Sequence, residues 1–98
     1  MDTKIQAVNF NAEESLNDFV SGRVQKLTQV FDNIISCEAY MKVDKSSKGG
    51  NKVTEIKLNI PGKELFAKKQ CETFEEATDQ VVDALRRQLR KYKGKIVA

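Results

Sequence analysis

The sequence contains no histidine and no tryptophan, and its 98 residues include only two cysteines and one proline. The lack of histidine removes both the commonest general base and the commonest metal ligand in proteins. Cys37 and Cys71 are far apart and do not form a Cys-x-x-Cys motif. We therefore expect two structural thiols in strands, with neither a disulfide nor a metal site. No other residues have the spacing of a catalytic group, so we expect no enzyme and no cofactor.

Long hydrophobic runs are also absent, because no segment approaches the roughly 20 apolar residues that a membrane span needs. The first residues lead directly into a strand pattern, which argues against a signal peptide and favours the cytosol. Hydrophobic residues make up 40% of the chain and charged residues 32%, which is ordinary for a globular protein. The length predicts one domain, residues 1–98.

Acidic residues are missing from the segment 86–98, which has a formal charge of +6 in a chain of net charge +3. Its basic residues are Arg86, Arg87, Arg90, Lys91, Lys93 and Lys95. Cations near a helix C-terminus complement the helix dipole, but this accounts for one or two of them at a few tenths of a kcal/mol each. Phosphate backbones are the usual partners of so dense a positive surface. The segment therefore predicts RNA binding.

Hydrophobic periodicity predicts an α+β fold in the order β-α-β-β-β-α. We expect strands over 3–8, 35–43, 53–60 and 65–71, a helix from Asn11 to Phe31, and a last helix from Thr73. Capping boxes are expected from Asn11 to Glu14 and from Thr73 to Glu76, and Pro61-Gly62 predicts a type II turn. Both helices should pack on one face of a four-stranded sheet, as in double-stranded-RNA-binding domains.

Helical spacing predicts where the basic residues lie. On the last helix, Arg86, Arg90 and Lys93 form one row, and Arg87 and Lys91 form a second row towards solvent. On the first helix, Arg23 and Lys26 lie three residues apart on one edge of the apolar stripe. If the helices pack side by side, we expect these residues to converge on one basic surface.

The open face of the sheet is a weaker candidate. Lys42 and Lys57 occupy outward strand positions, where a solvated face is the simpler interpretation. Tyr40 and Phe66 are expected on the same face, and aromatic residues on a sheet can stack on single-stranded bases. Because the pair lacks the glycine-aromatic signature of such sheets, we favour a packing role.

Several stretches together resemble a known family. They are Leu16, Phe19 and Val20; Lys26-Leu27 followed by Phe31-Asp32; Met41-Lys42-Val43; and, above all, Arg87-Gln88-Leu89-Arg90-Lys91-Tyr92-Lys93-Gly94-Lys95. In order and spacing they resemble the short ribosome hibernation-promoting factors. That family includes the ribosome-associated inhibitor protein Y and proteins once described as sigma-factor modulators. The resemblance runs from Met1 to about Lys95.

The resemblance implies the same fold and binding to the small ribosomal subunit, its 16S-type RNA and neighbouring ribosomal proteins. The protein would occupy the channel of messenger RNA and transfer-RNA anticodons, and would inhibit translation in stressed or stationary-phase bacteria. The residues carried over as phosphate contacts are Arg23, Lys26, Arg87, Arg90, Lys91, Lys93 and Lys95. Arg86 is added from its helical position. Such contacts position a protein on RNA without reading sequence.

Two features depart from the family pattern. The last helix begins with Thr73-Phe74-Glu75-Glu76-Ala77, which is more acidic than the family pattern. We also expect the chain to lack the C-terminal dimerisation domain of long family members. The residues also leave two other functions open. One is a general RNA-binding module or RNA chaperone without ribosome specificity, and the other is an adaptor that docks an acidic partner protein.

Overall fold

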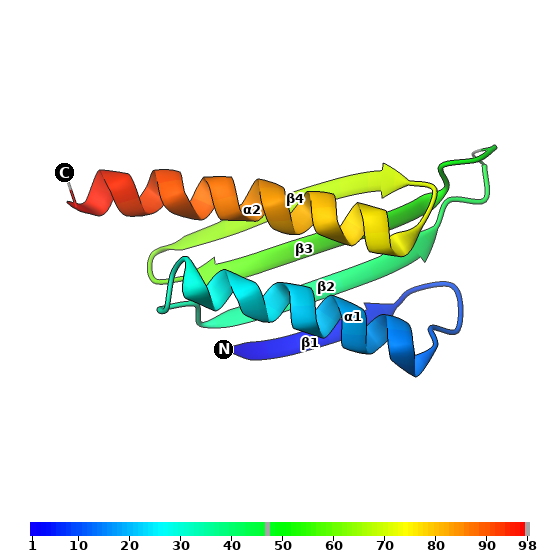
Figure 1. The fold of residues 1–98 in the computed structure, drawn as a ribbon, viewed down its shortest axis with the longest axis horizontal. Helices are drawn as coiled ribbons and strands as arrows, with labels where there is room; N and C mark the ends of the chain where they lie inside the picture. Colours follow the sequence, from blue (N-terminus) through cyan, green and yellow to red (C-terminus); the bar gives the residue numbers. More distant parts are fainter. Residues whose placement is uncertain (47, 98) are drawn as a thin grey trace.

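A computed structural model of the chain describes residues 1–46 and 48–97, with side chains as far as Gly94. Its elements are β1 (Asp2–Ala7), α1 (Glu14–Gln25), the 3-10 turn η1 (Lys26–Gln29), β2 (Ser36–Val43), β3 (Lys52–Ile60), β4 (Lys63–Cys71) and α2 (Phe74–Val97). This order confirms the β-α-β-β-β-α prediction. The strands form one sheet in the order β1-β2-β3-β4 (Figure 1). Over the described ranges, no helix combines the length and apolar character needed to cross a membrane.

The sheet combines one parallel and two antiparallel pairings. β1 runs parallel to β2, with Asp2 opposite Ser36 and Ala7 opposite Met41. β3 is antiparallel to both β2 and β4. Because parallel neighbours need a crossover connection, the chain passes through α1 and η1 between β1 and β2. This crossover places α1 over the sheet, beside α2.

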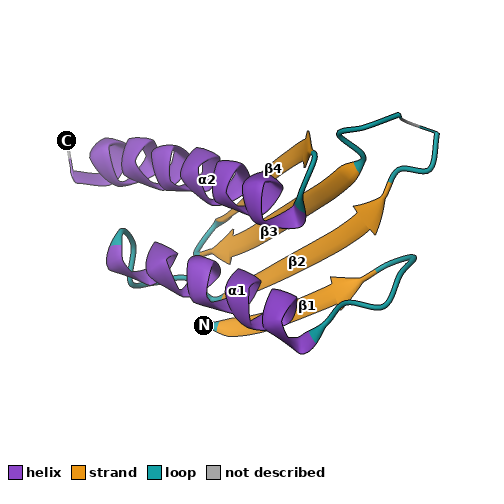
Figure 2. Ribbon diagram, turned by 45° about the vertical axis from the view of Figure 1, so that its right-hand side comes forward, coloured by secondary structure: helices purple, strands orange, loops and turns teal. Residues whose placement is uncertain are grey.

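Both helices cover the same face of the sheet, and the opposite face is open (Figure 2). Alternate strand residues point under the helices, as the strand period requires. The fully buried side chains there include Cys37, Ala39, Met41, Ile56 and Leu58 from the strands, Val20, Val24 and Leu27 from α1 and η1, and Val81, Leu85 and Leu89 from α2. This packing fixes the rotation of α2, and with it the directions of the charged residues on its other faces.

The two cysteines are buried free thiols, as expected. Burial, with the nearby carboxylate of Glu38, raises the pKa of Cys37 to about 12. Burial also raises the pKa of Cys71, and the neighbouring Glu76 adds to the effect. Because the thiolate is the reactive form, neither side chain is an activated nucleophile at neutral pH.

The start of the first helix differs from the sequence prediction. The Asn11–Glu14 capping box is wrong, because α1 begins only at Glu14 and its N-cap residue is Glu13. The loop before the helix is held by the sheet instead. The side chain of Asn9 donates to the carbonyl oxygen of Val43 and accepts from its N–H, both at 2.9 Å. The chain before α1 therefore follows these tertiary hydrogen bonds, and Asn11 does not act as the N-cap residue that the local sequence predicts.

The end of the first helix also differs. The sequence predicts one helix as far as Phe31, but α1 ends at Gln25 and η1 follows. The hydroxyl of Thr28 donates to the carbonyl oxygen of Gln25 at 2.7 Å. Such side-chain bonds compete with the helical pattern and accompany tighter turns. Leu27 stays fully buried, so the apolar stripe continues through the turn.

One half of the predicted Thr73–Glu76 capping box is present, and the turn predicted at Pro61-Gly62 is confirmed. The hydroxyl oxygen of Thr73 accepts from the N–H of Glu76 at 3.1 Å at the start of α2. Gly62 has a φ of +77°, the left-handed conformation that a type II turn requires after Pro61. The hydroxyl of Tyr92 donates to the carbonyl oxygen of Pro61 at 3.2 Å, so this turn lies against the C-terminal half of α2.

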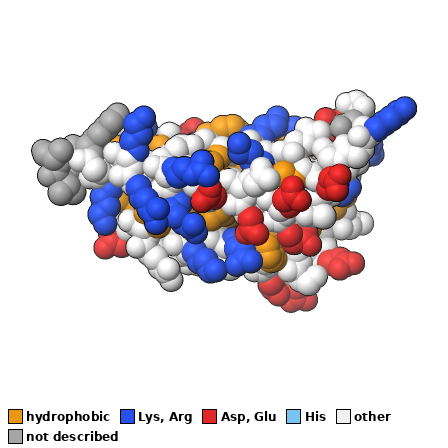
Figure 3. Space-filling view, turned by 45° about the horizontal axis from the view of Figure 1, so that its top comes forward, with side chains coloured by type: hydrophobic (Ala, Val, Ile, Leu, Met, Phe, Trp, Pro, Cys, Tyr) orange, Lys and Arg blue, Asp and Glu red, His pale blue; other side chains and the backbone are white. Residues whose placement is uncertain are grey.

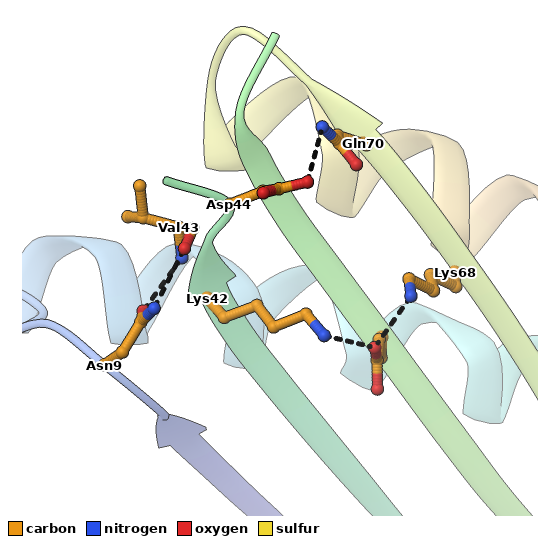
Figure 4. Close-up of polar contacts among 7 residues, drawn as sticks. Asn9, Lys42, Val43, Asp44, Lys68 and Gln70 are labelled. Atoms are coloured by element: carbon orange, nitrogen blue, oxygen red, sulfur yellow. Dashed lines mark hydrogen bonds and ion pairs between the residues drawn. The ribbon is translucent and has the colours of Figure 1, made fainter. Parts of the chain in front are cut away.

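Paired charges occupy the open face of the sheet (Figure 4). The Oε1 atom of Glu55 lies 3.5 Å from the Nζ of Lys42 and 3.4 Å from the Nζ of Lys68. The Nζ of Lys57 lies 3.6 Å from a carboxylate oxygen of Glu38. These ion pairs fit the interpretation of a solvated face, and they balance the lysines with carboxylates.

Candidate nucleic-acid interface

The C-terminal half of α2 carries the basic residues, and the burial of Leu89 against the core decides where they point. Arg90 and Lys93 emerge on the side that faces η1. There they line an open groove of about 500 Å³ with Gln29 and Val30. We call this the α2–η1 groove. It brings two cations, a carboxamide and an apolar side chain to one shallow, open part of the surface.

The α2–η1 groove is open to a ligand on the side formed by α2, at Gly94. Gly94 forms part of its lining, and a Cβ atom at this position would meet no atom within 4 Å. Lys26, the first residue of η1, is exposed. In the described part of the chain, no carboxylate forms an ion pair with Lys26, Arg90 or Lys93. These three cations therefore face solvent with their charge uncompensated.

Arg86 and Arg87 share one carboxylate. The Nη1 atom of Arg86 lies 3.8 Å from Oδ1 of Asp83, and Arg87 donates a hydrogen bond to Oδ2 of the same residue. The side chain of Arg87 is 74% exposed, whereas that of Arg86 is 32% exposed. A phosphate group would therefore reach Arg87 more easily, but it would compete with Asp83 for both guanidinium groups.

Lys91 lies on the other flank of α2, beside β4. The side-chain amide of Gln88 donates to the carbonyl oxygen of Phe66 at 3.1 Å and ties this flank to the strand. Lys91 lines a second groove of about 290 Å³ together with Lys63 and Tyr92. The Nζ of Lys63 lies 5.6 Å from the centre of the Tyr92 ring. The structure therefore separates Lys91 from the α2–η1 groove.

Lys63 is a basic residue that the sequence interpretation missed. It directly follows the turn at Pro61-Gly62, and basic residues at such turns are common on any surface. Its position matters because the Tyr92–Pro61 hydrogen bond holds this turn against α2. Nothing local in the sequence indicates that contact.

Arg23 is already paired within the protein. Its Nε lies 2.8 Å from Oδ1 of Asp79 on α2, and its guanidinium carbon lies 4.6 Å from the centre of the Phe19 ring. Of the two residues predicted from the first helix, only Lys26 therefore presents an unpaired charge within the described residues. The predicted site residue Lys95 lies in α2, but its side chain is outside the described residues.

Charge is distributed unevenly over the helical face of the molecule. Figure 3 shows Lys and Arg side chains crowded towards the C-terminal end of α2, and Asp and Glu side chains gathered towards the opposite end. The acidic side chains surround a hydrophobic patch in this view. The basic end offers a surface for polyanions, while the acidic end repels them.

Residues 3–97 match the family described as "Sigma 54 modulation protein / S30EA ribosomal protein". The chain belongs to this family. A ribosome hibernation promoting factor of Escherichia coli K12 is 31% identical over 96 residues, which cover 98% of this chain and 97% of the relative. One from Pseudomonas putida is 34% identical over 95 residues, which cover 97% of this chain and 89% of the relative. The S30EA family relationship thus extends over nearly the whole sequence.

Solved structures share the fold of this S30EA family member. A ribosomal subunit interface protein from Coxiella burnetii superposes with a TM-score of 0.86 at 17% identity, covering 96% of this chain and 99% of that one. The N-terminal domain of Thermus thermophilus Protein Y gives a TM-score of 0.78 at 19% identity, covering 94% of this chain and 99% of that one. At these identities the likeness supports the arrangement of the helices and strands.

Proposed function

We propose that this chain binds the small ribosomal subunit and holds ribosomes in an inactive, hibernating state. Membership of the S30EA family and the similarity to ribosome hibernation promoting factors support this function. The observation that carries the proposal is the α2–η1 groove, which Arg90 and Lys93 line without a carboxylate partner among the described residues. A protein with this function resides with ribosomes in the cytoplasm.

The surface would bind ribosomal RNA mainly through phosphate contacts. The contributing residues are Arg23, Lys26, Arg86, Arg87, Arg90, Lys91, Lys93 and Lys95. Lys26, Arg90 and Lys93 are available directly, whereas Arg86 and Arg87 must exchange Asp83 for a phosphate. Each neutralised phosphate also releases condensed counterions, which makes the affinity depend on salt.

Inhibition requires no chemical step. The molecule measures 45 × 23 × 18 Å, with the basic residues towards one end of its long axis. Inserted with that end against the RNA, it would occupy the channel of messenger RNA and transfer-RNA anticodons. Translation would stop because the substrates of decoding are sterically excluded.

Co-sedimentation in sucrose gradients tests the proposal. The purified protein is mixed with small subunits, large subunits or assembled ribosomes, with naked RNA at matched phosphate concentration as competitor. We expect stoichiometric binding to small subunits that survives the competitor. Binding that the competitor removes would identify a general RNA-binding module instead, and no binding to either would indicate an adaptor for an acidic protein.

A charge-reversal variant tests the surface. Replacing Arg87, Arg90 and Lys91 with glutamate should abolish binding to small subunits while circular dichroism shows an intact fold. The matched control replaces Lys45, Lys48 and Lys69 with glutamate, which makes the same change of charge at the far end of the sheet. Normal binding by the first variant, or equal loss in both, would rule out the proposed surface.

A further inference from the structure

The end of the molecule opposite the basic surface holds a groove that the proposed function does not use. It lies between the start of α1 and the start of α2 and has a volume of about 380 Å³. Its apolar lining comes from Phe10, Leu16 and Phe19, and its acidic lining from Glu13 and Glu75. We call it the N-terminal groove. The acidic start of the last helix, which departs from the family pattern, forms one of its sides.

The apolar lining is held in place by packing. The ring of Phe10 stacks on the buried ring of Phe74, with centroids 4.7 Å apart and an interplanar angle of 9°. Leu16 and Phe19 pack against the core but are only partly buried. A partly exposed apolar surface of this kind suits a single large apolar side chain, which is the usual anchor of a protein interface.

The charged lining is free to act on a ligand. Glu13 and Glu75 are exposed, and across residues 1–46 and 48–97 neither lies in an ion pair with a lysine or arginine. Carboxylates at helix starts complement the helix dipole, and this accounts for Glu75 as a stabilising residue. The helix dipole does not explain why the two carboxylates flank a groove that is lined by aromatic residues.

A contact within the protein, next to the groove, combines a cation with an aromatic ring and a carboxylate. The guanidinium group of Arg23 lies over the ring of Phe19 and pairs with Asp79, next to the groove. Arginine is thus bound here by an aromatic face and a carboxylate together, a combination that favours cations. The carboxylates of Glu13 and Glu75 in the groove would repel a phosphate backbone.

We propose that the N-terminal groove binds a cationic peptide segment of a partner protein through one large apolar side chain. The apolar side chain would lie among Phe10, Leu16 and Phe19, and flanking lysine or arginine residues would face Glu13 and Glu75. The interaction adds a protein-binding surface at the end opposite the RNA-binding surface. It does not depend on the proposed ribosomal function.

Fluorescence anisotropy of two labelled peptides tests the proposal. The peptides Lys-Arg-Phe-Arg-Lys and Lys-Arg-Gly-Arg-Lys have the same charge but differ in the apolar side chain. We expect the phenylalanine peptide to bind about tenfold more tightly, a difference of about 1.4 kcal/mol, because its ring is buried in the groove. Equal affinity of the two peptides, or no binding of either, would overturn the proposal.

A pair of double variants locates the interaction. Glu13→Lys with Glu75→Lys should lose the preference for the phenylalanine peptide. Asp2→Lys with Asp32→Lys makes the same change of charge outside the groove and should keep it. Loss in both variants would indicate only long-range attraction and would contradict the assigned site. Both double variants should still co-sediment with small subunits, so this result is independent of the RNA-binding surface.

The alternative occupant is a second copy of this chain, whose basic helix end is also cationic. Sedimentation velocity of the wild-type protein over a range of concentrations distinguishes this case. A monomer throughout supports the assignment of a separate partner. A concentration-dependent dimer that disappears in the Glu13→Lys, Glu75→Lys variant would overturn it in favour of self-association.

Discussion

Arg23 of α1 and Asp79 of α2 form an ion pair that joins the two helices, with Nε and Oδ1 2.8 Å apart. The pair lies between the basic and the acidic parts of the helical face. Asp79 already compensates the charge of Arg23. A phosphate contact with Arg23 should therefore contribute less binding free energy than a contact with an unpaired arginine. Its role in the structure is first to connect α1 with α2.

Substitutions of Arg23 and Arg90 should therefore differ in their effect on ribosome binding. We expect Arg90→Gln to lower the slope of log K against log salt concentration by about one unit, the effect of one lost phosphate contact. Arg23→Gln should lower it by clearly less. Binding to small subunits at several salt concentrations measures both slopes. A larger change for Arg23→Gln would show that the ion pair opens on binding.

Asp83 should limit the affinity for RNA, because it holds both Arg86 and Arg87. We expect Asp83→Asn to increase the affinity and to steepen the salt dependence by about one unit. The helix should lose only about 0.2–0.5 kcal/mol for each side-chain pair. Titration of small subunits measures the gain, and thermal unfolding measures the loss. Unchanged affinity would mean that the two arginines do not contact phosphate.

The hydroxyl groups of Thr54 and Thr78 lie 3.3 Å apart in the core, and both residues are fully buried. Replacing either one by valine leaves the other hydroxyl without this hydrogen bond, which should cost about 1–3 kcal/mol. Replacing both should cost less than the sum of the two single changes, because no unpaired hydroxyl remains. Urea denaturation of the four proteins completes this double-mutant cycle. Additive losses would show that the two hydroxyls are not coupled.

Alkaline pH should destabilise the protein through Cys37. Burial raises the pKa of this thiol from its ordinary 9.0 to about 12, so above pH 9.0 the unfolded chain releases a proton that the folded chain retains. The stabilisation is complete below pH 9.0 and is lost as the pH rises towards 12, by up to about 1.4 kcal/mol per pH unit. The unfolding free energy of Cys37→Ala should fall less steeply than that of the wild type over this range. Parallel curves would exclude Cys37 as the cause.

The sequence predicted the elements whose signals are local and consistent. The type II turn needs only Pro61 and Gly62, and the start of α2 needs only Thr73 and its hydrogen bond to Glu76. The limits of the first helix depend on distant contacts instead. The hydrogen bonds between Asn9 and Val43 connect residues 34 positions apart, and no local pattern indicates them.

For the candidate site, the sequence predicted the positions of basic residues along α2 but not their partners on other elements. Helical spacing places Arg90 and Lys93 on one flank of α2, and the structure brings both to the α2–η1 groove. Spacing along a single helix cannot show which carboxylate of another helix lies opposite. For this reason the partner of Arg23 and the position of Lys63 beside Tyr92 required the tertiary structure.

The separation of charge along α2 also affects how the protein meets a large polyanion. The helix has 24 residues and is therefore about 36 Å long, with carboxylates near its first turns and cations near its last. The field of an RNA surface attracts one end and repels the other, and the resulting torque turns the molecule before any contact forms. More encounters then begin in the productive orientation, which raises the association rate. Salt weakens this guidance beyond a Debye length of about 8 Å, so the association rate should fall with ionic strength.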